Sequence, residues 1–422
     1  MQRIVISGGN KLCGEVDVQG SKNSTLPILA ATVLVNGVSV IHNCPDLSDV
    51  NAAVEILRHL GCLVKRENNT LIVDSSNISC YNIPDCLMRE MRSSIVFLGS
   101  VLGRTGRAVL SSPGGCDIGL RPIDLHLSSL KSLGVKIDES HGSINCELVS
   151  SIDGGVISLS FPSVGATENI ILACTLSKGR TVILNAAREP EIKDLADFIN
   201  SCGGKINIGA QGTIVIDGVN ELHCAEHNVI SDRIVALTYM CAVVSATGEI
   251  ILKNVDTSAF MSALPLFETM GCEIKDKRDI LSIKMKKRPK AIRDIRTMPY
   301  PGFPTDAQAP VMASLCKAEG TSVLVENIFE SRFKHVPELM RMGAKIKIEG
   351  KVALIDGSEN LYGASVTAPD LRGGAALVVA ALGANGETII DGLRHIDRGY
   401  ENIEKTFSAL GADIKRRKIR GA

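Results

Sequence analysis

The chain has 422 residues, which is long for a single domain and favours two domains or an array of repeats. Its 46 Lys and Arg residues are balanced by 46 Asp and Glu residues, which argues against a general nucleic-acid binder and against a polybasic membrane-surface protein. Aromatic residues make up only 3% of the chain, so stacking on bases or sugar rings is not expected to be its main mode of recognition.

The thirteen cysteines are expected to be reduced thiols in a cytoplasmic protein. No C-x-x-C pair occurs, and no apolar run approaches the roughly 20 residues needed to cross a bilayer. Residues 1–6 are predicted to form a strand and not a secretory leader, because they have no charged segment followed by an apolar one. Twelve cysteines stand in apolar segments and are predicted to lie in the core or in buried strands, whereas Cys116 stands in a glycine-rich loop.

Taken in chain order, one set of elements is predicted six times: an apolar helix, a strand, an amphipathic helix that ends at glycine, and a β-hairpin. The apolar helices are predicted at residues 26–35, 95–102, 169–176, 234–246, 310–316 and 375–382. The glycines after the amphipathic helices are Gly61, Gly134, Gly203, Gly271, Gly343 and Gly411. These glycines, and a second series before the strands, recur every 66–73 residues. Since glycine adopts a left-handed helix C-cap without a steric penalty, the two series indicate six repeats of one unit.

The first helix of each repeat is apolar on nearly every side. A helix of this kind must be buried all round, so the sheets are expected to lie outside the helices. The predicted fold class is therefore α/β, with buried helices surrounded by sheets.

The two ends of the chain are predicted to complete one repeat. The last unit has a single hairpin strand, residues 413–416, whereas residues 3–9 resemble the second hairpin strand of another unit at 352–358. We therefore expect the N-terminal strand to close the last unit. An open solenoid of six units is the alternative. Closure predicts two domains of three units each: residues 21–230 as domain I, and residues 1–20 with 231–422 as domain II.

Charged residues collect just before the predicted helices. Unpaired N–H groups and the helix dipole make helix starts attractive to anions, and a nearby Lys or Arg adds to this preference. Several such ends would suit a ligand with many phosphates and carboxylates, and the balancing acidic side chains are expected elsewhere. Ordinary N-caps and local ion pairs are the alternative. The cations concerned include Lys22, Arg92, Arg121, Arg188, Arg233, Arg332, Arg372 and Arg398.

The segment at residues 111–122 stands outside this scheme. It contains three glycines and two prolines, which predicts a mobile loop that could act as a lid. An accessible Cys116 thiol in such a loop, with cations nearby, is a candidate nucleophile or proton donor. An incidental surface cysteine is the alternative.

The same loop carries a family resemblance. Residues 113–126 read Pro-Gly-Gly-Cys-x-Ile-Gly-x-Arg-Pro-x-Asp-Leu-His and resemble the signature loop of the UDP-N-acetylglucosamine 1-carboxyvinyltransferases, the enolpyruvyl transferases of peptidoglycan synthesis. Six further segments resemble the same family in the same order, so the resemblance covers nearly the whole chain. These segments are residues 20–23, 163–167, 187–191, 303–306, 335–339 and 395–401.

This resemblance implies an inverted α/β barrel of two domains, with three repeated units each and the active site in the cleft between them. It implies transfer of the enolpyruvyl group of phosphoenolpyruvate to the 3′-hydroxyl of UDP-N-acetylglucosamine with release of phosphate, the first committed step of peptidoglycan synthesis. The implied partners are these two small molecules, with no nucleic acid, membrane, metal or redox cofactor. The oligomeric state stays open.

The resemblance also implies roles for individual residues. The catalytic residues would be Cys116, Asp306, Lys22 and Arg398, and phosphoenolpyruvate would be bound by Lys22, Asn23, Arg121 and Arg398. Cys116 would donate a proton, form a thioketal adduct with phosphoenolpyruvate and be the target of fosfomycin, and Asp306 would be the base. The residues implied for the sugar nucleotide are Arg92, Arg121, Pro122, Ile123, Asp124, Leu125, Asp306 and Ile328.

Two other functions compete with this interpretation. The sister enzyme that makes 5-enolpyruvylshikimate 3-phosphate shares the fold and the donor, but it has no counterpart of the Cys116 loop. A catalytically silent paralogue would have no reason to keep Lys22, Cys116, Asp306 and Arg398 together. The basic run at residues 284–290 is interpreted as a solvated strand end rather than as a nucleic-acid site.

Overall fold

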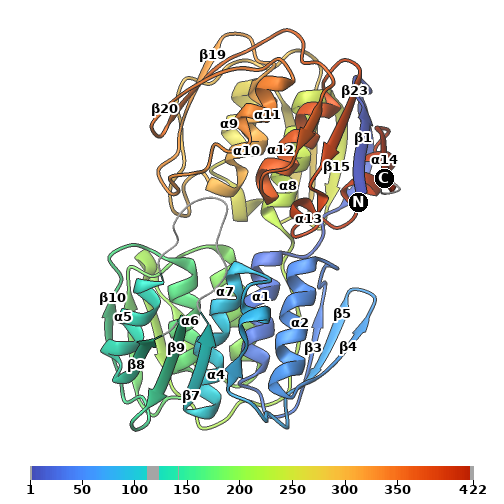
Figure 1. Ribbon diagram of the computed structural model, residues 1–422. Helices are drawn as coiled ribbons and strands as arrows, with labels where there is room; N and C mark the ends of the chain where they lie inside the picture. Colours follow the sequence, from blue (N-terminus) through green and yellow to red (C-terminus); the bar gives the residue numbers. More distant parts are fainter. Residues whose placement is uncertain (1, 112–122, 141, 419–422) are drawn as a thin grey trace. The chain divides into compact units, whose positions relative to one another are not determined.

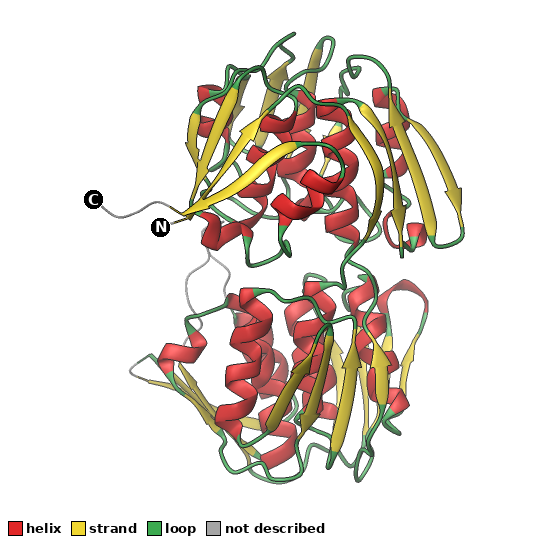
Figure 2. Cartoon of the chain, turned by 90° about the vertical axis from the view of Figure 1, so that its right-hand side faces the viewer, coloured by secondary structure: helices red, strands yellow, loops and turns green. Residues whose placement is uncertain are grey.

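The computed structural model describes residues 2–111, 123–140 and 142–418. They form two compact units, coloured along the sequence in Figure 1. The C-terminal unit contains residues 2–19 and 231–418, and the N-terminal unit contains residues 20–111 and 123–230. Within each unit the buried helices lie inside and the strands lie outside them (Figure 2).

The N-terminal unit has three buried helices and three four-stranded sheets. Its buried helices are α1 (Lys22–Thr32), α4 (Phe97–Thr105, preceded by the 3₁₀ helix η1, Arg92–Val96) and α6 (Val164–Cys174). Its outer helices are α2 (Ser48–Leu60), α3 (Asp85–Met88), α5 (Asp124–Ser132) and α7 (Pro190–Ser201), and a short 3₁₀ turn, η2, spans Ala210–Gly212. In strand order, the first sheet consists of β14 (Glu226–Asn228), β3 (Val38–His42), β5 (Thr70–Asp74) and β4 (Leu63–Glu67). The second consists of β6 (Asn82–Ile83), β7 (Arg107–Ser111), β9 (Ser143–Leu148) and β8 (Val135–Ser140). The third consists of β10 (Gly154–Ser158), β11 (Arg180–Leu184), β13 (Ile214–Asp217) and β12 (Ile206–Ile208).

The C-terminal unit repeats this plan. Its buried helices are α8 (Arg233–Ala246), α10 (Thr305–Leu315) and α12 (Leu371–Leu382). Its outer helices are η3 (Thr257–Phe260), α9 (Leu264–Met270), α11 (Val336–Arg341), α13 (Leu393–Ile396) and α14 (Ile403–Ala409). In strand order, its first sheet consists of β2 (Leu12–Asp17), β15 (Gly248–Lys253), β17 (Ile280–Met285) and β16 (Glu273–Lys277). The second consists of β18 (Ile295–Arg296), β19 (Thr321–Val325), β21 (Val352–Asp356) and β20 (Lys345–Glu349). The third consists of β22 (Ser365–Thr367), β23 (Glu387–Asp391), β1 (Gln2–Ser7) and β24 (Asp413–Lys418).

All six sheets share one topology. An edge strand runs parallel to the strand that follows a buried helix, and two antiparallel strands complete the sheet. These two strands form a hairpin in five of the sheets, whereas β1 and β24 take their place in the sixth. The predicted α/β class with buried helices and six repeats is confirmed, although none of these sheets closes into a barrel. The parallel edge strands were not predicted from the sequence. The shortest of them, β6 and β18, have two residues each and carry no readable alternation.

The N-terminal strand β1 lies in the sixth sheet. It pairs with β23 on one side and β24 on the other, with Ile4 opposite Ile390 and Arg416. Ile4 and Ile6 are fully buried, so the register is set by the apolar face of the strand. Both ends of the described chain therefore belong to one sheet, of which β1 and β23 are labelled in Figure 1.

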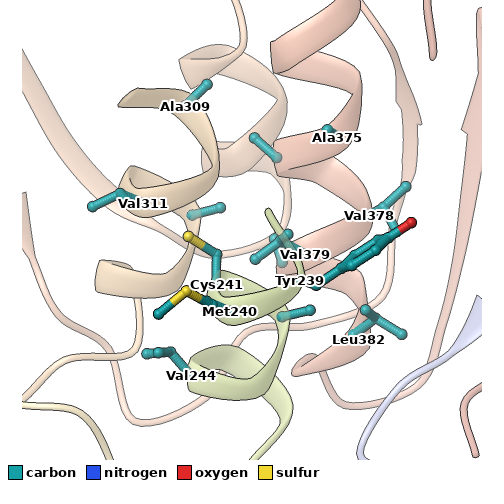
Figure 3. Close-up of a cluster of buried hydrophobic side chains, with 14 of the residues drawn as sticks. Tyr239, Met240, Cys241, Val244, Ala309, Val311, Ala375, Val378, Val379 and Leu382 are labelled. Carbon is teal, nitrogen blue, oxygen red and sulfur yellow. The ribbon is translucent and has the colours of Figure 1, made fainter. Parts of the chain in front are cut away.

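Three helices form the core of the C-terminal unit. Every residue of α8 is buried, and α8, α10 and α12 contact one another in pairs. Figure 3 shows side chains of Tyr239 and Met240 from α8 and of Val378 and Val379 from α12, which all belong to this core. Full burial of each such apolar side chain contributes roughly 1.5–3 kcal/mol to stability. Among the described helices, none is both long and apolar enough to cross a membrane.

Glycine ends the amphipathic helices as predicted. The six glycines of the first series all have positive φ, between 86° at Gly134 and 107° at Gly61. Five of the six buried helices begin earlier than predicted, as α1 does at Lys22 rather than at residue 26, whereas α4 begins at Phe97, after the predicted residue 95. The reason is local capping: the Ser21 hydroxyl accepts the Ser24 N–H, and the Asp370 carboxylate accepts the Arg372 N–H. Charged residues therefore stand within the first helical turns.

The prediction for the twelve other cysteines was partly wrong. Eight are buried, and burial raises the pKa of thiols such as Cys44 and Cys316 to about 12. Cys13, Cys86 and Cys224 are instead exposed, and Cys80 is half-buried. Cys13 is exposed because it follows buried Leu12 on β2, where successive side chains point to opposite faces.

The basic run at residues 284–290 ends strand β17, as the sequence indicated. Lys284 pairs with Glu249 on the neighbouring strand, and Lys286 pairs with Glu273 at 2.5 Å. Arg288 donates to the carbonyls of Lys317 and Ala318 at 2.7 and 2.8 Å. These cations therefore have internal partners.

Candidate functional site

The predicted site residues fall into two sets. Lys22, Asn23, Arg92, Ile123, Asp124 and Leu125 belong to the N-terminal unit, and Asp306, Ile328 and Arg398 belong to the C-terminal unit. Cys116, Arg121 and Pro122 lie outside the described residues, as does most of the predicted lid at 111–122.

Lys22 is the first residue of α1 and is almost completely buried. Its ammonium nitrogen lies 3.3 Å from Asp49 Oδ2, in the first turn of α2. Lys22 is 8% exposed and Asp49 is 2% exposed. A buried cation requires such a partner, and removing one member of a buried ion pair typically costs about 3–5 kcal/mol. Asn23, the next residue, is half-buried.

Arg92 begins the 3₁₀ helix before α4 and lies near a buried histidine. His126, on α5, is 7% exposed, and its Nδ1 atom lies 2.7 Å from the Asn169 amide nitrogen. Asn169 Oδ1 accepts the Gly99 N–H at 2.6 Å, so the amide nitrogen must be the donor to His126. Burial, together with the positive charge of Arg92, lowers the pKa of His126 to about 4. The imidazole is thus neutral at pH 7. Its hydrogen bond to Asn169 links α5 to α6, and the bond from Gly99 to Asn169 adds α4 to this link.

Residues 123–125 form the start of α5. Ile123 is the N-cap, and its carbonyl accepts the N–H groups of His126 and Leu127. Ile123 and Leu125 are half-buried against the core of the N-terminal unit, whereas Asp124 is exposed. Asp124 is therefore the member of this stretch whose side chain is open to solvent.

Asp306 occupies the first turn of α10 and is held by two arginines. Its Oδ1 accepts from Arg332 at 2.7 Å, and its Oδ2 accepts from the Arg372 Nη2 and Nε atoms at 3.0 and 3.3 Å. The side chains of Arg332 and Arg372 are 4% and 3% exposed, while that of Asp306 is 27% exposed. The two buried arginines therefore fix the carboxylate from the protein interior, while part of the Asp306 side chain remains exposed to solvent.

Arg372 is itself fixed by a second layer of contacts. Its Nη1 donates to the Tyr400 hydroxyl at 3.2 Å, and the guanidinium stacks over the Tyr400 ring at 5.6 Å. The Tyr400 hydroxyl also contacts the Thr238 hydroxyl at 2.9 Å. Burial raises the pKa of Tyr400, so it stays a neutral phenol beside the guanidinium. From the sequence, Arg332 and Arg372 were predicted only as cations before helices, and their role as partners of Asp306 is seen only in the structure.

Arg398 stands in a loop that is held on both sides. Gln19 holds the residues that follow Arg398. Its amide N–H donates to the Gly399 carbonyl at 3.2 Å, and its amide oxygen accepts the Glu401 N–H at 2.9 Å. On the other side, Arg416 binds both carboxylate oxygens of Asp397 at 2.7 and 3.0 Å. The backbone around Arg398 is thus restrained by side chains from both ends of the chain.

One expectation about charge was wrong. Acidic side chains were expected away from the cations at the helix starts, but Asp49 and Asp306 lie directly against them. The physical reason is burial, because an ammonium or guanidinium removed from water must be paired. Within the described ranges, no cluster of His, Cys, Asp and Glu is arranged to hold a metal ion.

Comparison with known proteins gives the same family over the whole chain. The profile of the EPSP synthase family, described as EPSP synthase (3-phosphoshikimate 1-carboxyvinyltransferase), matches residues 6–407. UDP-N-acetylglucosamine 1-carboxyvinyltransferase 2 of Caldanaerobacter subterraneus subsp. tengcongensis is 53% identical over 416 residues, covering 99% of this chain and 100% of the relative. The UDP-N-acetylglucosamine 1-carboxyvinyltransferase of Trichlorobacter lovleyi is 44% identical over 416 residues, covering 99% of each chain.

Solved structures give the same fold. The enolpyruvyl transferase NikO from Streptomyces tendae superposes with a TM-score of 0.89 at 25% identity and covers 98% of both chains. An EPSP synthase from Acinetobacter baumannii superposes with a TM-score of 0.77 over 99% of this chain and 100% of that one, at 16% identity, which shows the fold alone. The chain belongs to the EPSP synthase family and, within it, to the UDP-N-acetylglucosamine 1-carboxyvinyltransferases, which confirms the resemblance recognised in the sequence.

Proposed function

We propose that the chain transfers the enolpyruvyl group of phosphoenolpyruvate to the 3′-hydroxyl of UDP-N-acetylglucosamine and releases phosphate. The observation that carries the proposal is 53% identity over 416 residues to a relative named for this activity. The product would enter peptidoglycan synthesis. The reaction would take place in the cytoplasm, which is consistent with twelve described cysteines that are all free thiols.

The reaction asks first for cations that bind a small trianion. We assign this role to Lys22 and Arg398, and by resemblance to Asn23 and to Arg121 outside the described residues. Lys22 suits it because its ammonium stands at the start of α1, where the helix dipole also favours an anion. Arg398 suits it because Gln19 and the Asp397–Arg416 pair restrain its loop, which lowers the entropy lost on binding.

The bond-forming step requires an acid and a base. A proton added to the methylene carbon of phosphoenolpyruvate, by Cys116 in this proposal, leaves positive charge at C2. The 3′-hydroxyl oxygen of the sugar then bonds to C2 while Asp306 takes its proton. The Cys116 thiolate then takes back one proton of the new methyl group while phosphate leaves with the proton held by Asp306, which restores the double bond and both side chains, so atoms and charge balance. The resemblance also implies that Cys116 can form a thioketal adduct with phosphoenolpyruvate.

Asp306 has the geometry of a positioned base. Arg332 and Arg372 hold both of its oxygens from the protein side, so the carboxylate cannot rotate away from an incoming hydroxyl. The sugar nucleotide would contact Arg92 and the 121–125 stretch in the N-terminal unit, and Ile328 with Asp306 in the C-terminal unit. These contacts are carried over by resemblance.

The test of the proposal is phosphate release from phosphoenolpyruvate with alternative acceptors. We expect release with UDP-N-acetylglucosamine and none with shikimate 3-phosphate or without an acceptor. Release only with shikimate 3-phosphate would assign the chain to the sister activity, and no release with either would favour a silent paralogue. Preincubation with fosfomycin and the sugar nucleotide should abolish release in the native chain.

A further inference from the structure

A buried carboxylate that the proposed reaction does not use lies beside Asp306. Glu326 follows strand β19 and is 3% exposed. Its Oε1 accepts the N–H groups of Ile328 and Phe329 at 2.8 and 3.1 Å and the Thr297 hydroxyl at 2.9 Å. Its Oε2 accepts the Thr305 hydroxyl at 2.9 Å. Four donors thus converge on one side chain.

These four contacts join two parts of the candidate site. Ile328 is half-buried in an irregular segment after β19, which has no strand or helix to fix its backbone. Thr305 is the first residue of α10 and immediately precedes Asp306, and its carbonyl accepts from Arg332 at 3.2 Å. The carboxylate therefore links the segment that carries the apolar contact to the helical turn that carries the base.

The surroundings of Glu326 add to this fixation. The Thr297 hydroxyl, which donates to Glu326, accepts the Asn327 N–H at 2.8 Å, and the Asn327 amide donates to the Thr297 carbonyl at 3.2 Å. Thr297 is fully buried. Three consecutive backbone N–H groups, at residues 327, 328 and 329, are thus satisfied by this pair of side chains. Hydrogen bonds to an ionised acceptor are about twice as strong as neutral ones.

We propose that Glu326 is a positioning residue that fixes the 327–329 segment against the first turn of α10, so that Ile328 and Asp306 are held at a set distance before the sugar nucleotide binds. This inference rests on the proposed function for the roles of Ile328 and Asp306. Because the carboxylate is buried and engaged by four donors, it acts through these neighbours rather than on the substrate.

Two substitutions separate positioning from general stability. Glu326→Ala leaves the N–H groups of Ile328 and Phe329 without their acceptor, whereas Glu326→Gln keeps Oε1 for them and lets its amide donate to Thr305. Glu338→Ala is the matched control: Glu338 lies on α11 of the same unit and accepts the Thr367 N–H at 3.1 Å, but it has no bond to the 327–329 segment.

The first experiment measures the kinetics of phosphate release for the native chain and each variant. For Glu326→Ala we expect KM for UDP-N-acetylglucosamine to rise and kcat to fall, each at least about tenfold, with KM for phosphoenolpyruvate changed about threefold or less. Glu326→Gln should restore both values to within about threefold of the native chain. Glu338→Ala should lower Tm and leave both KM values unchanged. Unchanged KM and kcat in Glu326→Ala, with a drop in Tm like that of Glu338→Ala, would overturn the proposal.

The second arm needs no substrate. Amide hydrogen exchange of residues 327–333 should be faster in Glu326→Ala than in the native chain, and close to native in Glu326→Gln and Glu338→Ala. If the native chain proves inactive, the proposed function fails while this exchange pattern still decides whether Glu326 orders the segment. Native exchange rates in Glu326→Ala would refute the positioning role by themselves.

Discussion

His126 offers a direct test of the electrostatics inside the N-terminal unit. Its imidazole is 7% exposed, and the orientation of Asn169 forces Nδ1 to be a hydrogen-bond acceptor. Protonation would place an N–H group at Nδ1 against the Asn169 amide hydrogens, in a buried site near the positive charge of Arg92. Burial and the positive charge of Arg92 both disfavour the protonated ring, and they lower the pKa of His126 to about 4 from its ordinary value of 6.5.

The lowered pKa sets the sign and size of a stability change. The unfolded chain protonates this histidine near pH 6.5 and the folded chain does not, so the unfolded state binds more protons between pH 6.5 and 4. Stability from His126 is complete above pH 6.5 and is lost as the pH falls toward 4. At pH 5.0 the loss corresponds to 1.5 pH units, or about 2 kcal/mol.

Two measurements check this value. An NMR titration of the native chain should show the His126 ring still neutral at pH 5.0. Urea unfolding at pH 7.5 and 5.0 should show that the native chain loses about 2 kcal/mol more than His126→Gln, whose amide oxygen can still accept from Asn169. Other titrating groups cancel in that difference. A ring that titrates near pH 6.5, or an equal loss of stability in both proteins, would refute the reasoning.

Three further predictions concern packing, helix ends and chemistry. A Cβ at Gly99 would lie 2.3 Å from the Asn169 carbonyl oxygen, so Gly99→Ala should destabilise the chain by about 3 kcal/mol in urea unfolding, and a change under 1 kcal/mol would contradict the close packing of α4 and α6. The Lys317 ammonium donates to the Ser245 and Gly383 carbonyls at the ends of α8 and α12, at 3.2 and 2.7 Å, and Lys317→Met should cost roughly 1–3 kcal/mol with unchanged KM values. An unaltered midpoint of unfolding would show that these bonds contribute nothing. Cys116→Ala should abolish phosphate release, whereas Cys116→Asp should retain it because a carboxylic acid can donate the same proton; full activity of the alanine variant would exclude a thiol acid.

The repeat was predictable because its signals are local. A helix end such as Gly61 needs a left-handed residue, and glycine meets that need wherever the unit recurs. The short edge strands were not predictable, since a pair such as β6 with β7 forms through partners that are distant in the sequence. β2 and β14 are the clearest cases, because each completes a sheet whose other strands come from a different part of the chain.

The same limit applies to the candidate site. Residue types at helix starts, such as Lys22 and Asp306, could be identified from spacing and family resemblance. Their ion-pair partners could not, because Asp49 lies 27 residues from Lys22 and Arg372 lies 66 residues from Asp306. Pairing over such separations depends on how the buried helices pack, which local patterns do not encode.

The choice of acceptor is the central claim, and one competition experiment tests it most directly. The native chain is incubated with phosphoenolpyruvate and equal concentrations of UDP-N-acetylglucosamine and shikimate 3-phosphate, and the products are identified by mass spectrometry and NMR. We predict a single enolpyruvyl ether, on the 3′-oxygen of the sugar nucleotide, formed in equal amount to the phosphate released. An enolpyruvyl ether on shikimate 3-phosphate, or phosphate release without either ether, would contradict the account.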